Sequence, residues 1–242
     1  MKPFARLATM LGRARRRWFG RTLVVDPRPI ASEAPYTFYL PSENELLAIG
    51  PGDLIKVTIQ SVPPSPEWGA ERLWFTVLTA EGERLRAMLD NQPYDIPQLA
   101  LGQIIDLPRA AVIDIIWQEG RAVAPPSAPA RREYWDRCFV DDCVLAGRSP
   151  VDYLYREEPD MDGPDDRHPD SGWRLRGTDD AIADDKQHDL PPQYVALGKV
   201  LNRDDSWLHL IDAPIGSAFI RNAAGGFDAA CDPDLTDPPA RQ

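Results

Sequence analysis

The sequence predicts an α+β protein made of two small domains, a β-rich N-terminal one and a mixed C-terminal one. Its 242 residues suffice for two domains of about 100 to 150 residues each. The first half carries a series of short alternating apolar segments, which is the pattern of half-buried strands, whereas the second half interleaves strand patterns with short helical ones. A stretch rich in proline and alanine at residues 121–131 separates the halves.

The charge of the chain is divided unevenly along its length. The formal net charge is -11, yet residues 1–21 hold seven basic side chains and no acidic one. The remaining residues carry the other 20 basic side chains and all 38 acidic ones, a net charge of -18. An acidic body repels phosphate backbones and attracts basic partners, so we expect no nucleic-acid binding by the body.

Residues 1–32 are interpreted as a basic N-terminal extension. Within it, residues 3–20 predict an amphipathic helix, because Phe4, Leu7, Leu11 and Trp18 recur near one face while arginines cluster toward its end. We expect a solvated or poorly ordered extension. The alternative is an anchor for a membrane surface or an acidic partner.

The sequence favours a cytoplasmic protein without a disulfide framework. Its three cysteines, Cys138, Cys143 and Cys231, cannot all pair with one another. The N-terminus lacks the apolar core and cleavage site of a secretory signal, and no segment approaches the roughly 20 apolar residues that cross a bilayer.

Residues 33–118 predict the β-rich domain, a partial barrel or twisted sheet. A short helix should open at the capping box of Ser42 and Glu45 and stop at Gly50 and Pro51. Five segments with strand patterns follow, at residues 54–60, 72–79, 84–90, 103–107 and 111–117.

The Pro/Ala segment at residues 119–131 predicts a linker, because consecutive prolines and alanines favour extended conformations. Residues 132–228 then predict the α+β domain. Strands are expected in FVDDCVLAG, PVDYLYRE, WRLRG and GSAFIRN, and short helices at residues 179–186 and 193–201. Residues 229–242 have no periodicity and predict a disordered tail.

No catalytic or metal-binding constellation stands out in the sequence. Cys138 and Cys143 lack a second cysteine pair, and the aspartates of residues 160–166 lack the ligand spacing of an EF-hand loop. Ser171 has no nucleophile-elbow frame, and nothing matches a glycine-rich phosphate loop. We therefore expect a protein that is not an enzyme and has no metal or cofactor.

One segment, residues 155–180, is unusual, because its 26 residues contain nine carboxylates, four arginines and three prolines. Such a composition predicts a stiff, negatively charged recognition loop, since charges steer encounters and aromatic anchors supply contact energy. The predicted partner-binding residues are Glu157, Glu158, Asp160, Asp162, Asp165, Asp166 and Trp173. Those expected to structure the loop are Arg156, Asp170, Ser171, Gly172 and Arg174, with both arginines pairing to Glu157, Glu158 and Asp170 and with Ser171-Gly172 forming a turn.

Several blocks resemble known bacterial families. YREEPD at residues 155–160, DSGWR at 170–174 and DAPIGSAF at 212–219 resemble a domain family grouped with polymorphic-toxin immunity proteins. The resemblance spans about residues 138–222, with a longer segment between the first two blocks than is usual. In the first half, PGDLIKV, ERLWFTV and LDNQPYDIP resemble a second, uncharacterised family, which implies a small β-rich module.

The resemblance implies a non-enzymatic immunity protein that neutralises a cognate bacterial toxin. The acidic composition adds that the toxin is basic and that an acidic surface meets it. The alternative is an accessory or regulatory module that binds another protein or a small ligand.

Overall fold

The protein is described by a computed structural model that covers residues 12–65, 68–121, 124–127, 130–161, 163 and 167–230. The chain forms two compact units. Unit 1 comprises Met1–Glu33 and Phe38–Arg131, and unit 2 comprises Ala34–Thr37 and Arg132–Gln242. Each unit contains one β-sheet with its own hydrophobic core.

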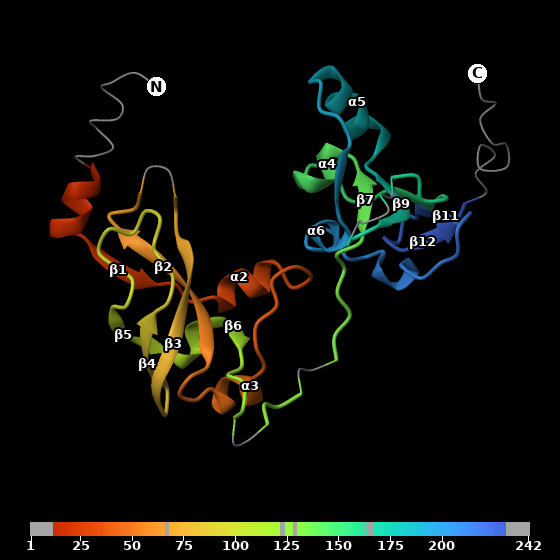
Figure 1. The fold of residues 1–242 in the computed structure, drawn as a ribbon. Coiled ribbons are helices and arrows are strands. Elements are labelled where there is room, and N and C mark those ends of the chain that lie inside the picture. Colours follow the sequence, from red (N-terminus) through yellow and green to blue (C-terminus); the bar gives the residue numbers. More distant parts are fainter. Residues whose placement is uncertain are drawn as a thin grey trace. The chain divides into compact units, whose positions relative to one another are not determined.

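Unit 1 is a six-stranded antiparallel sheet that curls into a nearly closed, barrel-like shape (Figure 1). Its strands are β1 (Arg21–Val24), β2 (Leu54–Val62), β3 (Glu71–Glu81), β4 (Arg84–Leu89), β5 (Ile104–Pro108) and β6 (Val112–Ile116). The order is β1-β2-β3-β4-β5, and β6 pairs with the first part of β2. The five expected strand segments therefore correspond to β2 through β6.

Side-chain alternation in β2 explains why this strand is central. Ile55, Val57 and Ile59 are fully buried, while the residues between them are partly exposed. This is the period of a strand with one face on the core. The buried residues of β3 and β4 complete the same core.

The strand β1 lies inside the segment that we expected to be a basic extension. Arg21 through Val24 pair with Val62 through Ile59 of β2, because Thr22 and Val24 turn inward while Arg21 and Leu23 stay outside. The sheet therefore begins before residue 33. Of the expected N-terminal helix, residues 12–19 are helical, and residues 1–11 lie outside the described part.

Two short helices follow β1, α2 (Arg28–Glu33) and α3 (Glu43–Ala48). The capping box at the start of α3 is confirmed: the Glu45 amide donates to Ser42 Oγ, and the Glu45 carboxylate accepts from the Ser42 amide at 2.8 Å. The 3-10 helix η1 (Arg109–Ala111) joins β5 to β6.

Unit 2 contains a six-stranded mixed sheet of order β10-β7-β9-β8-β11-β12. The strands are β7 (Arg137–Val140), β8 (Tyr153–Arg156), β9 (Asp170–Arg176), β10 (Gln193–Ala196), β11 (Ala218–Arg221) and β12 (Phe227–Ala229). Only β7 and β9 run parallel among these pairs. The helical segments are α4 (Asp142–Leu145), α5 (Asp179–Gln187), α6 (Leu197–Leu201) and η2 (Leu208–Leu210).

A short early segment, Ala34–Thr37, belongs to unit 2 rather than to unit 1. The Tyr36 amide donates to Asn202 Oδ1 at 2.9 Å, and the Tyr36 hydroxyl donates to Asp205 at 2.7 Å. The ring of Tyr36 packs edge-on against Tyr134. Sequence reasoning assigned this segment to the first domain, because no local pattern reveals partners more than 160 positions away in the chain.

Two expected elements of the second half were partly wrong. The apolar run at 139–147 is strand only to Val140 and then turns into α4. Residues 193–201 were expected to form a helix, but 193–196 are β10 because Tyr194 and Val195 pair with β7. Aromatic and β-branched residues favour such a pleated position. The helix α6 occupies only the second part of this segment.

None of the described helices has both the length and the apolar character needed to cross a membrane. The expected disordered tail at 229–242 lies largely outside the described residues, and its first residue, Ala229, is the last residue of β12.

Candidate functional site

The candidate site is the face of the unit 2 sheet that points away from the core. On the core face, Trp173 and Leu175 of β9 pack with Cys138 and Val140 of β7. Because side chains alternate along a strand, Arg174 lies on the opposite face. Its register partners are Phe139 on β7 and Tyr155 on β8, so these three side chains form a row across three strands.

A β-bulge in β9 sets this arrangement. Between Arg137 and Phe139 the register advances by two residues on β7 and by four on β9, from Asp170 to Arg174. Gly172 sits in the bulge with φ +79, and a Cβ there would lie 2.2 Å from the Glu157 carbonyl oxygen. Only glycine allows both the left-handed backbone and this close approach. Ser171-Gly172 is thus a bulge within a strand, not the turn that we expected.

Trp173 was expected as a surface anchor, and the structure corrects this expectation. Its side chain is fully buried, and its Nε1 donates to the Ile211 carbonyl at 3.1 Å. Its ring lies 5.9 Å from that of Trp207. The bulge turns Trp173 into the core, so this side chain is not available to a partner.

Arg174 binds three carboxylates, two of which lie in the segment between β8 and β9. It donates to both oxygens of Asp170 at 2.9 Å, to Glu157, and to Asp160 at 3.0 Å. Glu157 and Asp170 are two of the acids that the sequence analysis assigned to it. The guanidinium also stacks over Phe139, with its carbon 4.9 Å from the ring centroid.

The protonation states at this cluster follow from the pairing. Burial alone would raise the pKa of Asp170, but hydrogen bonds from Arg174 and from the Gly172 amide lower that pKa overall. Burial alone would lower the pKa of Arg174, but the Asp170 and Glu157 carboxylates raise it overall. Both groups are therefore charged at neutral pH, and the cluster carries a net negative charge.

Arg156 does not pair with Glu157, Glu158 or Asp170 in the described part of the chain, contrary to our expectation. Its guanidinium donates to the carbonyl oxygens of Ser171 at 3.0 Å and Ala213 at 2.7 Å, and it lies over the Trp173 ring. Arg156 thus joins β8 to β9 and to the segment before β11 through their backbones. Asp160, expected to be unpaired, contacts Arg174 although its side chain is 70% exposed.

A cavity of about 420 Å³ opens on this face. Its lining includes the row of Phe139, Arg174 and Tyr155, together with Glu157, Asp160 and Pro192. A second ion pair, formed by Arg176 and Asp141, also lines it. In this ion pair, Arg176 Nε donates to Asp141 at 2.8 Å. Sequence reasoning missed Phe139, Tyr155, Arg176 and Asp141, since their convergence depends on strand register that no local pattern reports.

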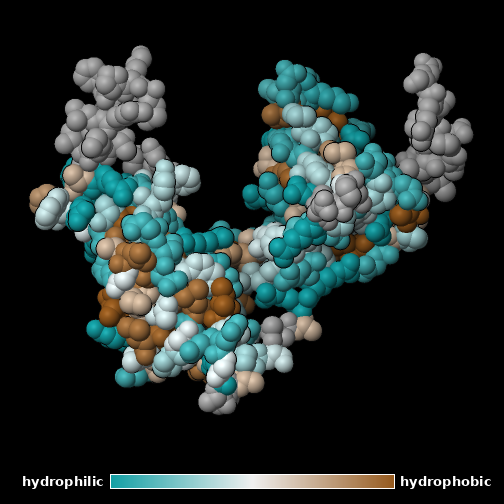
Figure 2. All heavy atoms as spheres, viewed as in Figure 1, coloured by the Kyte–Doolittle hydropathy of each residue, from teal (hydrophilic) through white to brown (hydrophobic). Residues whose placement is uncertain are grey.

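The remaining predicted partner-binding acids of this segment do not line the cavity as far as the structure describes them. Glu158 is exposed. Asp162, Asp165 and Asp166, which were expected to be partner-binding, lie outside the described residues. A second acidic surface is α5, whose Asp179, Asp180 and Asp184 are exposed and whose surroundings are mostly hydrophilic (Figure 2).

The surroundings of the buried cysteines, of His168 and of Ser171 bear on metal binding and on nucleophilic chemistry. Over the described ranges, no three His, Cys, Asp or Glu side chains converge in a way that could hold a metal ion. Cys138 and Cys143 are buried, and burial raises the pKa of both thiols, that of Cys143 to about 12, so neither is a thiolate nucleophile at neutral pH. His168 and Ser171 do not form a hydrogen-bonded pair, since Ser171 Oγ donates to the Arg137 carbonyl.

Comparison with known proteins points to the same part of the chain. Residues 138–230 match the model of the immunity protein Imm33 domain family. This match covers β7 through β12, and therefore the whole cavity face. No curated protein matches the chain significantly. No solved structure matches it significantly either.

Proposed function

We propose that the protein is a non-enzymatic immunity protein, which acts in the cytoplasm and neutralises a cognate toxin by binding it through the cavity face of unit 2. The observation that carries the proposal is the coincidence of two features. Residues 138–230 match an immunity domain, and the open face with its acidic rim lies within those residues.

The composition of the face suits protein recognition. Aromatic and arginine side chains supply most of the energy at protein interfaces, and Phe139, Tyr155 and Arg174 stand side by side here. The side chain of Arg174 is only 6% exposed, so Phe139 and Tyr155 offer a partner more surface than Arg174 does.

The rim supplies the charge that would attract a basic toxin. Glu158 and Asp160 are exposed, and we propose that the negative charges of Asp162, Asp165 and Asp166 also contribute to partner binding. Acidic charges around an aromatic centre accelerate association with a basic protein and compete with its nucleic-acid substrate. Glu157 and Asp170 act differently, because they hold Arg174 in place from within.

The test is a rescue experiment with a candidate toxin taken from the genes that neighbour this one. Cells that express the toxin domain alone should die, and co-expression of the chain should restore growth. The double variant Phe139→Ala/Tyr155→Ala should lose rescue while remaining folded by circular dichroism. A matched pair of exposed changes on unit 1, Leu101→Ala/Ile104→Ala, should rescue fully. Equal rescue by both variants would contradict the assignment of the face.

A further inference from the structure

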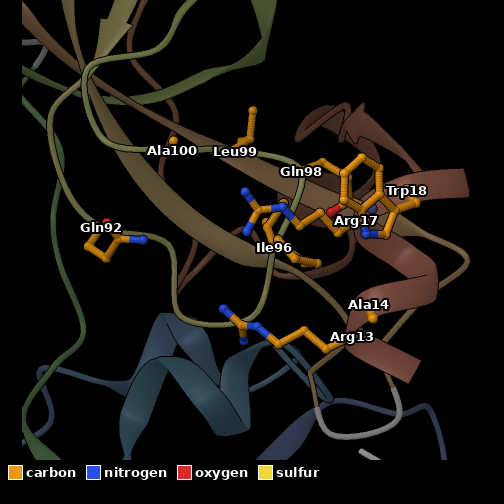
Figure 3. A pocket seen from close by; sticks show the side chains of 10 residues that line it. Arg13, Ala14, Arg17, Trp18, Gln92, Ile96, Gln98, Leu99 and Ala100 are labelled. Carbon is orange, nitrogen blue, oxygen red and sulfur yellow. The ribbon is translucent and has the colours of Figure 1, made fainter. Parts of the chain in front are cut away.

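A second cavity, of about 630 Å³, lies entirely in unit 1. It is bounded on one side by the helix at residues 12–19 and on the other by the loop between β4 and β5 (Figure 3). The helix contributes Arg13, Arg17 and Trp18, and the loop contributes Gln92, Ile96 and Leu99. Its walls therefore combine guanidinium, amide, aromatic and aliphatic groups.

The helix that forms the first wall is fixed to the loop between β4 and β5. Arg16 is 4% exposed, and its Nη2 donates to Asp95 at 2.5 Å. The helix ends at Gly20, whose amide donates to the Arg16 carbonyl. A Cβ at Gly20 would lie 2.4 Å from that carbonyl oxygen and 2.9 Å from the Val62 carbonyl oxygen. This close packing keeps the cavity wall in a defined position.

Both lining arginines extend into the cavity, toward the loop that carries Gln92 (Figure 3). Arg13 is partly engaged, since its Nη1 donates to the Tyr94 carbonyl at 2.8 Å and contacts Asp95 at 3.3 Å. The side chain of Arg17 makes no hydrogen bond or ion pair with any residue that the structure describes. The nearby acids are occupied, because Asp95 binds Arg16 and Glu71 accepts from the Tyr94 and Asp95 amides.

The rim of the cavity is aromatic and basic. Trp18 is 77% exposed and Phe19 is 86% exposed. Arg15 and Arg21 are exposed beside them, and the first 21 residues contain no acid. Exposed aromatic side chains next to arginines are typical of helices that lie at the surface of an anionic bilayer.

We propose that this end of unit 1 binds anionic phospholipid, with the headgroup phosphate held in the cavity by Arg13 and Arg17. Planar guanidinium groups recognise phosphate oxygens through paired hydrogen bonds. Trp18 and Phe19 then enter the interfacial layer, and Arg15 and Arg21 face neighbouring headgroups. The negative remainder of the chain is repelled by the same surface, so binding is confined to this end.

The test is cosedimentation of the full chain with vesicles of phosphatidylcholine, with or without phosphatidylglycerol. Binding should require the anionic lipid. Arg17→Gln and Arg15→Gln remove the same charge from neighbouring positions, but only Arg17 lines the cavity. Arg15→Gln should weaken binding about fivefold through lost charge alone. Arg17→Gln should weaken it about tenfold or more beyond that, because charged hydrogen bonds are lost as well.

A further variant distinguishes binding to a lipid surface from binding of free phosphate. Trp18→Ala/Phe19→Ala should reduce vesicle binding and leave any binding of inorganic phosphate unchanged. The proposal is overturned if the chain does not bind anionic vesicles or binds only inorganic phosphate. It is also overturned if Arg17→Gln and Arg15→Gln reduce vesicle binding by the same factor. The Arg17→Gln variant should still rescue cells from the toxin, so this test is independent of the proposed function.

Discussion

Arg174 and Asp170 form a bidentate ion pair at the base of the acidic loop, with both hydrogen bonds at 2.9 Å. The side chain of Asp170 is fully buried, and that of Arg174 is 6% exposed. A buried pair of this kind is costly to break, because the remaining charge loses its partner away from water. The pair also places Arg174 in the centre of the cavity face.

We predict that Asp170→Asn lowers the free energy of unfolding by about 3 kcal/mol. The matched control is Asp212→Asn, which breaks the exposed pair of Arg132 and Asp212 and should cost no more than about 1 kcal/mol. Urea denaturation of unit 2, followed by tryptophan fluorescence, measures both. Equal losses of unfolding free energy in the two variants would show that the buried pair stabilises the fold no more than the exposed pair does.

The same pair predicts that the free energy of unfolding depends on pH in the acidic range. The pKa of Asp170 is lowered from the ordinary 3.8 in the folded state. Its contribution is therefore fully present above about pH 4 and is lost as the pH falls through the lower folded value. The free energy of unfolding of wild type should fall below pH 4 more steeply than that of Asp170→Asn. Parallel curves for the two proteins would mean that Asp170 does not drive the acid sensitivity.

The bulge predicts a difference between two glycines of unit 2. Gly216 also has a positive φ, of +87, but a Cβ there meets nothing within 4 Å. Gly216→Ala should therefore cost about 1 to 3 kcal/mol for the strained backbone alone. Gly172→Ala should cost clearly more, because its Cβ also collides with the Glu157 carbonyl. Thermal unfolding of the two variants decides, and equal melting temperatures would argue against the close approach.

The linker segment predicts where proteases cut. Elastase should cleave within the Pro/Ala stretch at residues 119–131 and leave two resistant fragments. Because Ala34–Thr37 belongs to unit 2, the fragments should stay together on size exclusion. Tyr36→Ala, which removes the contacts with Tyr134 and Asp205, should let them separate. A single resistant core without a cut would contradict the division into two folding units.

The alternating apolar patterns of the sequence predicted most strands of the fold but few residues of the candidate site. The alternation of Ile55, Val57 and Ile59 is local, so β2 could be located from sequence alone. Asp170 was found as a partner of Arg174 because it lies four positions away in the chain, whereas the contact of Arg174 with Asp160 was missed. Phe139 and Tyr155 were missed because only the register of three strands brings them to Arg174. Trp173 was misplaced because the bulge at Gly172 decides which face it takes.

The central claim is that the acidic rim of unit 2 meets a basic toxin. The most direct measurement is the association rate with the toxin domain that this chain neutralises in the rescue experiment, by stopped flow at low and high salt. The variant Glu158→Gln/Asp160→Asn removes two exposed rim charges. The control Glu83→Gln/Glu119→Gln removes two exposed charges from unit 1.

We predict that the rim variant associates several-fold more slowly at low salt and with a flatter salt dependence, while the control matches wild type. Equal association rates for wild type, rim variant and control at low salt would contradict the claim.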